Sequence, residues 1–307
     1  MKQQSLRETW LKGKGAINAW CSIPNAVTAE MMSMNDFDSI TIDMQHGLVD
    51  YQVALNMLQV ISGSGKTPMV RVPWNEPGII MKSLDAGALG VICPMINTPE
   101  DAINFVGATK YAPVGNRSSG PTRAMMIHGA GYHDEANDNI ISFAMIETVE
   151  ALENVEKIAA TEGLTGIYIG PSDLSISMGF KPGLDRVEPE MIDAIKKIEN
   201  ACINNNIKVG IHCLSASYLK NKLSTGYHLA TLASDVRIYA ELAMFSTIFA
   251  FSDTRVIEVA CGSETISLDS YLTQPEQLIY SRGEASIISP YSLQTSHLTN
   301  SAIFSST

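Results

Sequence analysis

Several polar and ionisable side chains stand at the ends of short apolar runs, where they could carry out chemistry together. The segment TIDMQHG (residues 41–47) contains Asp43 at the end of an apolar run and His46 just before a glycine. Histidine titrates near neutral pH, so it can both take and give a proton in a reaction. The run TPMVR (67–71) ends on Arg71. These segments predict an acid–base group and a fixed positive charge at one site.

Two carboxylates occupy similar positions in later runs. Glu147 ends the run ISFAMIE, and Asp173 belongs to the segment GPSD that follows the run GIYIG. Two carboxylates completed by water and substrate suit the octahedral coordination of Mg²⁺ or Mn²⁺. A carboxylate pair can also carry out acid–base chemistry without a metal, as in glycosidases. The spacing of Glu147 and Asp173 leaves both hypotheses open.

The runs that carry these residues are expected to form one parallel sheet. Apolar runs rich in Ile, Val and Ala recur at residues 16–23, 39–43, 67–71, 90–94, 141–147, 166–170, 208–213 and 228–234. Segments with helical periodicity lie between most of them, as at residues 77–87, 98–110 and 189–206, and a last one at 235–251. Apolar strands that alternate with helices predict an α/β fold of the (β/α)₈ type, the TIM barrel.

In a barrel of this type the active site lies at the carboxyl ends of the strands, where the candidate residues occur. The seventh run carries His212 near its end, and the eighth leads into Asp235. Each residue also has a structural interpretation. Asp173 and Asp235 could cap the helices that follow them, and Arg71 could be an ion-pair partner.

Two kinds of chemistry are disfavoured because the residues and motifs that they need are missing from the strand ends. A Schiff-base aldolase needs a desolvated lysine at the mouth of the barrel, whereas Lys66 and Lys208 stand at the beginnings of the third and seventh runs. The sequence contains no Walker loop or GxGxxG motif, and no Gly-rich turn follows the last two runs. Neither imine chemistry nor a phosphorylated substrate is therefore expected.

The domain organisation follows from where the alternating pattern stops. Residues 1–251 are expected to form the barrel domain, and residues 252–307 a Ser/Thr-rich extension that is partly disordered or forms an interface. The connection at residues 111–140 is much longer than the others. Connections of this length are usually lids or binding loops, so we predict a functional loop there.

Composition excludes several classes of partner. The formal net charge of −11 argues against electrostatic binding of nucleic acid or of an anionic membrane. No apolar run approaches the roughly 20 residues of a membrane-spanning helix. The 5 cysteines are scattered and form no CxxC pair, which suits a reducing compartment. We therefore expect a cytoplasmic protein whose partners, apart from other copies of itself, are small molecules.

A succession of six segments identifies a family. IDMQHG, VRVP, DAGALGVICPMI, YAPVGNRSSGPTRA, MIET and GIYIGPSDLSISMG follow one another within residues 10–250. This order resembles the HpcH/HpaI aldolase family, the class II pyruvate-dependent aldolases of 2-keto-3-deoxy and 4-hydroxy-2-oxo acids. The resemblance implies a (β/α)₈ barrel, a homo-oligomer (trimer or hexamer) and a divalent cation that binds pyruvate. Mg²⁺ or Mn²⁺ is the expected cation, with Co²⁺ as a further candidate.

The resemblance also assigns roles at the strand ends. It implies that His46 is the acid–base residue and that Arg71 faces the keto oxygen of the substrate. Glu147 and Asp173 match the two metal ligands of the family. The four residues would together bind a 2-oxo acid and act on it.

Further positions match the family less directly. The backbone amides of Gly170 and Ser172 resemble those that hold the pyruvate carboxylate, and Asp85 resembles an aspartate that a neighbouring subunit contributes beside the catalytic histidine. Two positions depart from the pattern. Met145 replaces a glutamine of some members, and His212, a candidate substrate-binding residue, replaces an aliphatic side chain. Both departures bear on which aldehyde is used.

The function expected from these residues is that of an aldehyde-lyase. It would reversibly cleave a 4-hydroxy-2-oxo acid, of the 2-keto-3-deoxy sugar acid or 4-hydroxy-2-oxo-diacid type, to pyruvate and an aldehyde through a metal-stabilised enolate. One alternative is the same scaffold acting on another acceptor, as a CoA thioester lyase or a decarboxylase. Another is a non-catalytic module that binds 2-oxo acids.

Overall fold

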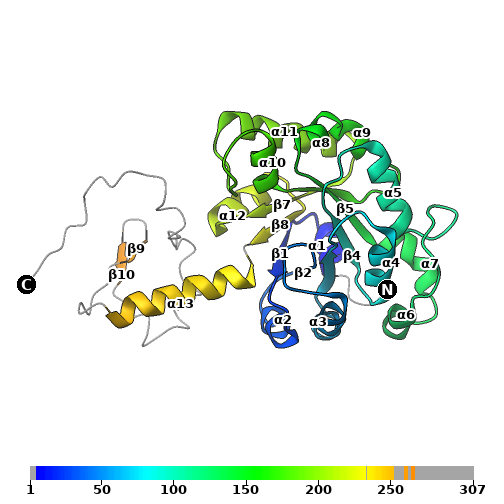
Figure 1. Ribbon diagram of the computed structural model, residues 1–307, viewed down its shortest axis with the longest axis horizontal. Helices are drawn as coiled ribbons and strands as arrows, with labels where there is room; N and C mark the ends of the chain where they lie inside the picture. Colours follow the sequence, from blue (N-terminus) through cyan, green and yellow to red (C-terminus); the bar gives the residue numbers. More distant parts are fainter. Residues whose placement is uncertain (1–4, 233, 252–258, 262–263, 267–307) are drawn as a thin grey trace, which may run out of the picture. The chain divides into compact units, whose positions relative to one another are not determined.

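A closed barrel of parallel strands is the central feature of the chain. The computed structural model describes residues 5–232, 234–251, 259–261 and 264–266. Contacts divide the chain into two units, residues 1–238 and 239–307. In the first unit the strands pair in chain order and the eighth closes on the first (Figure 1). They are β1 (Ala16–Cys21), β2 (Ser39–Asp43), β3 (Thr67–Arg71), β4 (Gly90–Cys93), β5 (Ile141–Ile146), β6 (Gly166–Ile169), β7 (Lys208–Cys213) and β8 (Leu229–Leu232).

Helices surround this barrel, and the predicted (β/α)₈ fold is confirmed (Figure 1). Each predicted apolar run contains one strand, and the four predicted helices are present. The helices of the barrel unit are α1 (Ser5–Leu11), α2 (Ala26–Ser33), α3 (Tyr51–Gly63), α4 (Pro77–Asp85), α5 (Pro99–Thr109), α6 (Thr122–His128), α7 (Tyr132–Asn139), α8 (Val149–Glu153), α9 (Val155–Ala159), α10 (Pro171–Ser177), α11 (Pro189–Asn204) and α12 (Ala216–Ser224). A further helix, α13 (Asp235–Phe251), begins in this unit and lies mostly in the second.

The long connection before β5 differs from the predicted loop, because it contains the two helices α6 and α7. Each buries a small apolar side chain, Ala124 in α6 and Ala136 in α7, so one face of each helix packs against the rest of the protein. Gly129 separates them with φ of 89°, a conformation that glycine adopts without steric cost. The segment is therefore an ordered part of the barrel wall.

Capping residues set where several helices begin. Before α5, the Thr98 side chain accepts from the N–H of Asp101, and the Asp101 carboxylate accepts in return from the N–H of Thr98. Asp50 caps α3 through the N–H of Val53. Such side chains supply acceptors that the first turn of a helix lacks.

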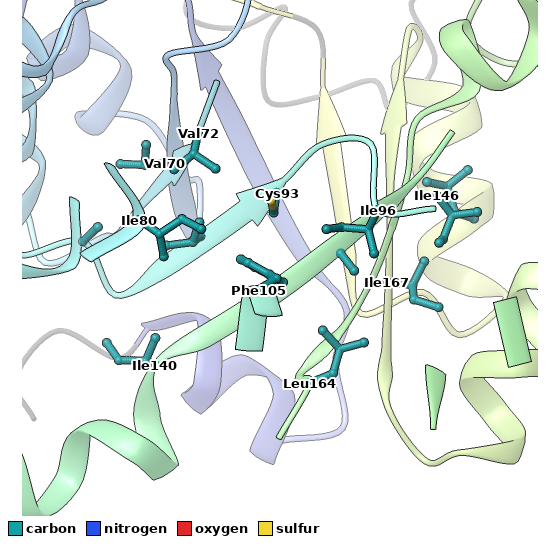
Figure 2. Packing of buried hydrophobic residues seen from close by; sticks show 14 of the residues in the cluster. Val70, Val72, Ile80, Cys93, Ile96, Phe105, Ile140, Ile146, Leu164 and Ile167 are labelled. Atoms are coloured by element: carbon teal, nitrogen blue, oxygen red, sulfur yellow. The ribbon is translucent and has the colours of Figure 1, made fainter. Parts of the chain in front are cut away.

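Apolar side chains form two cores. One fills the barrel interior and includes Met69, Phe143 and Tyr168. The other lies between strands and helices, and both Phe105 of α5 and Ile167 of β6 belong to it (Figure 2). Truncating a buried phenylalanine such as Phe105 typically costs about 3–5 kcal/mol.

Helix α1 covers the amino-terminal end of the barrel. Its Leu6 is buried in the inner core and donates its N–H to Thr67 Oγ1 at 3.1 Å, at the start of β3. Trp10 Nε1 donates to the carbonyl of His228, just before β8, at 2.6 Å. The carboxyl ends of the strands therefore form the end at which a substrate can enter.

The second unit holds most of α13 and a short antiparallel pair, β9 (Val259–Cys261) and β10 (Glu264–Ile266). Apart from this pair, the predicted extension 252–307 lies outside the described residues. None of the helices in the described ranges has the length and apolarity to cross a membrane.

Candidate active site

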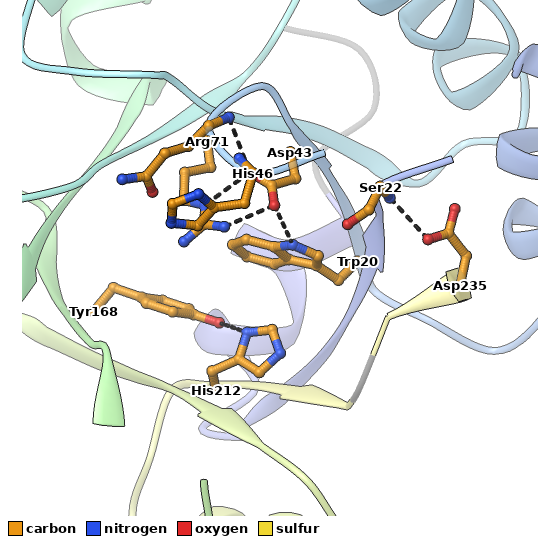
Figure 3. A network of polar contacts seen from close by, with 9 residues as sticks. Trp20, Ser22, Asp43, His46, Arg71, Tyr168, His212 and Asp235 are labelled. Carbon is orange, nitrogen blue, oxygen red and sulfur yellow. Dashed lines mark hydrogen bonds and ion pairs between the residues drawn. The ribbon is translucent and has the colours of Figure 1, made fainter. Parts of the chain in front are cut away.

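Asp43 connects the polar groups at the carboxyl ends of the first three strands (Figure 3). Its Oδ1 accepts from Arg71 Nε at 2.9 Å and from the backbone N–H groups of Gln45 and His46 at 3.0 and 3.2 Å. Its Oδ2 accepts from Arg71 Nη2 at 2.7 Å and from Trp20 Nε1 at 3.2 Å. Burial opposes the charge of Asp43, yet these donors hold its pKa below the usual value.

Arg71 is fixed by two kinds of contact. Its paired hydrogen bonds to Asp43 have the bidentate geometry that makes arginine–carboxylate contacts strong. Its guanidinium carbon also lies 4.8 Å from the centre of the Trp20 ring, a cation–π contact. The Nη1 group takes no part in the pair with Asp43. Arg71, with 11% of its side chain exposed, therefore carries a preorganised positive charge at the mouth.

His46 lies in the turn that follows β2, with an exposed side chain. The backbone N–H of His46 donates to Asp43 and holds the turn, so the imidazole takes no part in this contact. Gly47 closes this turn, because a Cβ there would overlap the carbonyl oxygen of Asp43. Beside His46, the Oε1 atom of Gln45 is buried and has no hydrogen-bond partner among the described residues.

Glu147 follows β5 and is almost completely buried, with 2% of its surface exposed. Its Oε1 accepts from the backbone N–H of Met95 at 2.7 Å. Burial and the charge of Asp173 raise the pKa of Glu147 to about 7, against the opposing effects of the Met95 N–H and of Arg71. Asp173 and Arg71 thus both act electrostatically on Glu147.

The turn from β6 into α10 places the other predicted residues. Asp173 is exposed and Ser172 is half-buried, both in the first turn of α10, where backbone N–H groups lack acceptors within the helix. The N–H of Gly170 instead donates to the carbonyl of Ile146 at 3.3 Å. A Cβ at Gly170 would lie 2.6 Å from Glu147 Oε2, so the glycine lets the Glu147 carboxylate approach this turn.

The carboxylates fit a hard divalent cation. Glu147 is buried and repelled by Asp173, so the site has negative charge that a cation would neutralise. Within the described residues, no group of three or more His, Cys, Asp and Glu side chains could hold a metal. Water and substrate oxygens would have to complete the coordination, as is usual for Mg²⁺.

His212 lies inside the barrel, beside Trp20 of β1 and Tyr168 of β6 (Figure 3). Its ring centre is 4.9 Å from that of Trp20, in an edge-on arrangement. Its Nδ1 is 3.2 Å from the Tyr168 hydroxyl. Burial, together with the positive charge of Arg71, lowers the pKa of His212 to about 3, so the imidazole is neutral.

Asp85 is not brought to His46 within this chain. It ends α4, and its Oδ1 accepts from Arg117 Nη2 at 2.7 Å. Arg117 is enclosed by aromatic rings, 4.5 Å from the centre of Tyr111 and 5.6 Å from that of Tyr132. Asp85 itself keeps 26% of its side chain exposed. It is therefore an ion-pair partner of the segment that follows α5.

The lysines lie where the sequence predicted. Lys66 directly precedes β3 and Lys208 is the first residue of β7, at the amino-terminal end of the barrel. Lys110 is buried, and burial lowers its pKa to about 8. Its Nζ donates to the carbonyl of Ile140, just before β5 begins, so this lysine also lies far from the mouth.

Sequence reasoning did not include Trp20, Tyr168 and the Met95 N–H among the site groups. A signal existed for Trp20, because residues two apart on a strand share a face and Trp20 is two residues after the polar Asn18 in β1. Asp235, which the sequence left open between capping and catalysis, accepts from the N–H groups of Ser22 and Ile23 and so anchors the loop after β1.

Comparisons with known proteins agree with this geometry. The model of the HpcH/HpaI aldolase/citrate lyase family matches residues 17–241. The hydroxypyruvate/pyruvate aldolase of Rhizorhabdus wittichii is 37% identical over 78% of this chain and 95% of that protein. The 5-keto-4-deoxy-D-glucarate aldolase of Shigella dysenteriae serotype 1 is 31% identical over 73% of this chain and 87% of that protein.

A solved structure is similar over the same region. The crystal structure of an HpcH/HpaI aldolase/citrate lyase family protein from Burkholderia cenocepacia J2315 covers 81% of this chain and 100% of its own, with 27% identity and a TM-score of 0.75. The predicted fold and the predicted aldolase function are thereby confirmed. The chain is an enzyme that belongs to the HpcH/HpaI aldolase/citrate lyase family.

Proposed function

We propose that the protein uses a divalent cation, Mg²⁺ or Mn²⁺ with Co²⁺ as a further candidate, to cleave a 4-hydroxy-2-oxo acid reversibly to pyruvate and an aldehyde. The observation that carries the proposal is that buried Glu147 lies against the turn at Gly170 that leads to Asp173, while Asp43 fixes the charge of Arg71 at the same mouth. Acidic groups that could hold a cation thus lie beside a fixed positive charge. This is the combination that a reaction through an anionic 2-oxo acid requires.

The cation would be held by Glu147 and Asp173. When bound, it supplies Lewis-acid polarisation of the carboxylate and keto oxygens of the 2-oxo acid, which acidifies the adjacent carbon. Arg71 then places positive charge where the keto oxygen becomes negative, because Asp43 and Trp20 hold its guanidinium in place. A preorganised donor of this kind is typically worth about 3 kcal/mol of transition-state stabilisation.

The remaining residues bind the substrate and move the proton. The Ser172 N–H, in the first turn of α10, can hold the substrate carboxylate, and Gly170 makes room for Glu147 beside it. His46 is exposed at the mouth, and among the described residues only its backbone N–H is anchored, so its imidazole is available to protonate or deprotonate the alcohol of the aldol.

Proton exchange on pyruvate tests the proposal directly. In deuterated water, the protein with Mg²⁺ or Mn²⁺ is expected to replace the methyl protons of pyruvate by deuterium, and chelation of the metal is expected to stop the exchange. Proton NMR of pyruvate measures this. Binding of pyruvate without exchange would favour the non-catalytic module. Exchange without aldol cleavage would favour a lyase or decarboxylase that uses another acceptor.

We also propose a cytoplasmic location and a homo-oligomer, a trimer or hexamer. Cys21, Cys93, Cys202 and Cys213 are free and buried, which agrees with a reducing compartment. The oligomer would bring Asp85 of one subunit beside His46 of another, where a carboxylate can fix the tautomer of the imidazole and raise its basicity.

The shared site leads to a complementation prediction. Homo-oligomers of His46→Ala and of Asp85→Asn are each expected to be nearly inactive, because each lacks one member of every pair. Subunits mixed after unfolding and refolding should regain activity, since some sites then draw intact residues from different chains. Cleavage rates before and after mixing provide the measurement.

Asn at position 85 keeps an oxygen that can accept from Arg117, so this variant separates catalysis from folding. If the Asp85→Asn homo-oligomer is fully active, the role of Asp85 is structural and not catalytic. The same conclusion would follow if exchange of subunits, seen by native mass spectrometry, restored no activity.

A further inference from the structure

His212 has a fixed orientation in the barrel interior. Its imidazole packs edge-on against Trp20, with 4.9 Å between ring centres, and its Nδ1 is 3.2 Å from the Tyr168 hydroxyl. Part of the side chain stays exposed. The Nδ1 atom of His212 therefore contacts the protein, whereas its Nε2 has no hydrogen-bond partner among the described residues.

The Tyr168 hydroxyl decides which ring nitrogen of His212 carries the proton. It donates its only proton to Thr231 Oγ1 at 2.6 Å. Thr231 Oγ1 also accepts from Asn18 Nδ2, at 2.9 Å. The Tyr168 oxygen can therefore only accept from His212, so Nδ1 is the protonated nitrogen and Nε2 carries a lone pair.

The charges around His212 keep it in this neutral form. Arg71 faces it from β3, Asp43 from β2, and Arg237 from the start of α13. Burial and Arg71 act against protonation and outweigh Asp43. Burial also raises the pKa of Tyr168, so the phenol keeps the proton that it donates. An imidazole of this kind accepts hydrogen bonds at Nε2 and cannot donate one there.

We infer that His212 makes the enzyme selective for substrates that present a hydroxyl group to Nε2. The inference rests on the proposed aldolase function and deepens it. A hydroxyl donor satisfies the lone pair, whereas an aldehyde or 2-oxo acid with a methyl group or hydrogen there leaves a partly buried acceptor unpaired. The hydroxyl can belong to the 2-oxo acid, next to its reacting carbon, or to the aldehyde.

The decisive measurement is a ratio of kcat/KM values. In the donor arm, 3-hydroxypyruvate is compared with pyruvate, each with propanal. In the acceptor arm, glycolaldehyde is compared with acetaldehyde, each with pyruvate. Wild-type protein is expected to prefer the hydroxylated compound about 10-fold or more in one arm, and His212→Leu should reduce that preference to near one. The arm that changes identifies the source of the hydroxyl.

A variant of Tyr168 tests whether the orientation of the His212 ring, and not only its size, produces the substrate preference. Tyr168→Phe removes the oxygen that fixes the tautomer, so the preference should fall several-fold, mainly through KM, while Mn²⁺ affinity is retained. Tyr218→Phe on α12 is the matched control, since Tyr218 lies outside this network. Nitrogen-15 NMR of labelled histidine should show Nδ1 protonated between pH 6 and 8 in wild type and a mixture of tautomers in Tyr168→Phe.

The outcomes that overturn the inference are distinct from failure of the proposed function. If wild type is active and both ratios are the same in His212→Leu and His212→Gln, His212 does not select for a hydroxyl. A protonated Nε2 in the NMR spectrum would overturn it as well. If wild type shows no turnover, the aldolase proposal fails, and dissociation constants of 3-hydroxypyruvate and pyruvate in the same variants then decide the role of His212.

Discussion

Replacing Glu147 by Gln is expected to weaken Mn²⁺ binding by more than about 100-fold, because even the outer partners of metal ligands typically contribute about 10–100-fold. Asp173→Asn should have an effect of similar size, since either change leaves one anionic ligand and a cation held mainly by water and substrate. Cleavage of the aldol substrate should be lost in parallel. Titration of Mn²⁺ into the metal-free protein, followed by electron paramagnetic resonance, measures the affinity.

Glu153→Gln is the matched control, because Glu153 is exposed at the end of α8, a few residues from Glu147. It should bind Mn²⁺ like wild type. Wild-type affinity in both Glu147→Gln and Asp173→Asn would mean that the metal lies elsewhere.

The same assay has a pH dependence with a defined sign. Burial raises the pKa of Glu147 to about 7 in the metal-free protein, so below pH 7 the cation must displace a proton. Wild-type Mn²⁺ affinity should therefore fall as the pH is lowered from 8 to 6 and level off above about pH 8. Glu147→Gln has no proton to displace there, so its residual affinity should vary less over this range.

Removing the imidazole of His46 should slow cleavage by about 100-fold or more, the usual contribution of a positioned acid–base group. Mn²⁺ affinity should change little, because the proposed ligands are Glu147 and Asp173. The turn should also persist in His46→Ala, since Asp43 holds it through the backbone N–H of residue 46. Steady-state rates measured across the pH range, with thermal unfolding as the check on folding, test this expectation.

Leu48→Ala is the control for the turn, because Leu48 is 82% exposed two residues further along. Its activity should match wild type. If His46→Ala kept both the wild-type rate and the wild-type pH profile, the catalytic assignment would be wrong. A lower melting temperature with an unchanged rate per folded molecule would point to a structural role instead.

The sequence predicted the barrel because parallel strands buried on both faces must be apolar along their whole length. Strands such as Ile141–Ile146 and Gly166–Ile169 therefore stand out between helix-like segments. The same pattern located the mouth, since polar side chains occur where these runs end. Helices α6 and α7 were missed because their sequences, TRAMMIH and YHDEANDN, are short and lack a sustained apolar period.

The sequence by itself determined which end of which strand carries Glu147, Asp173, Arg71 and His46, because strand order and direction in a barrel follow from the chain. Only the tertiary structure decided the partners of these side chains. Asp43 meets Arg71 across 28 residues of sequence, Tyr168 meets His212 across 44, and Asp85 meets Arg117 across 32. Such contacts depend on the closure and register of the barrel, which no local pattern of residues encodes. The tautomer of His212 and the buried charge of Glu147 follow from those contacts, so they became visible only once the strands were in place.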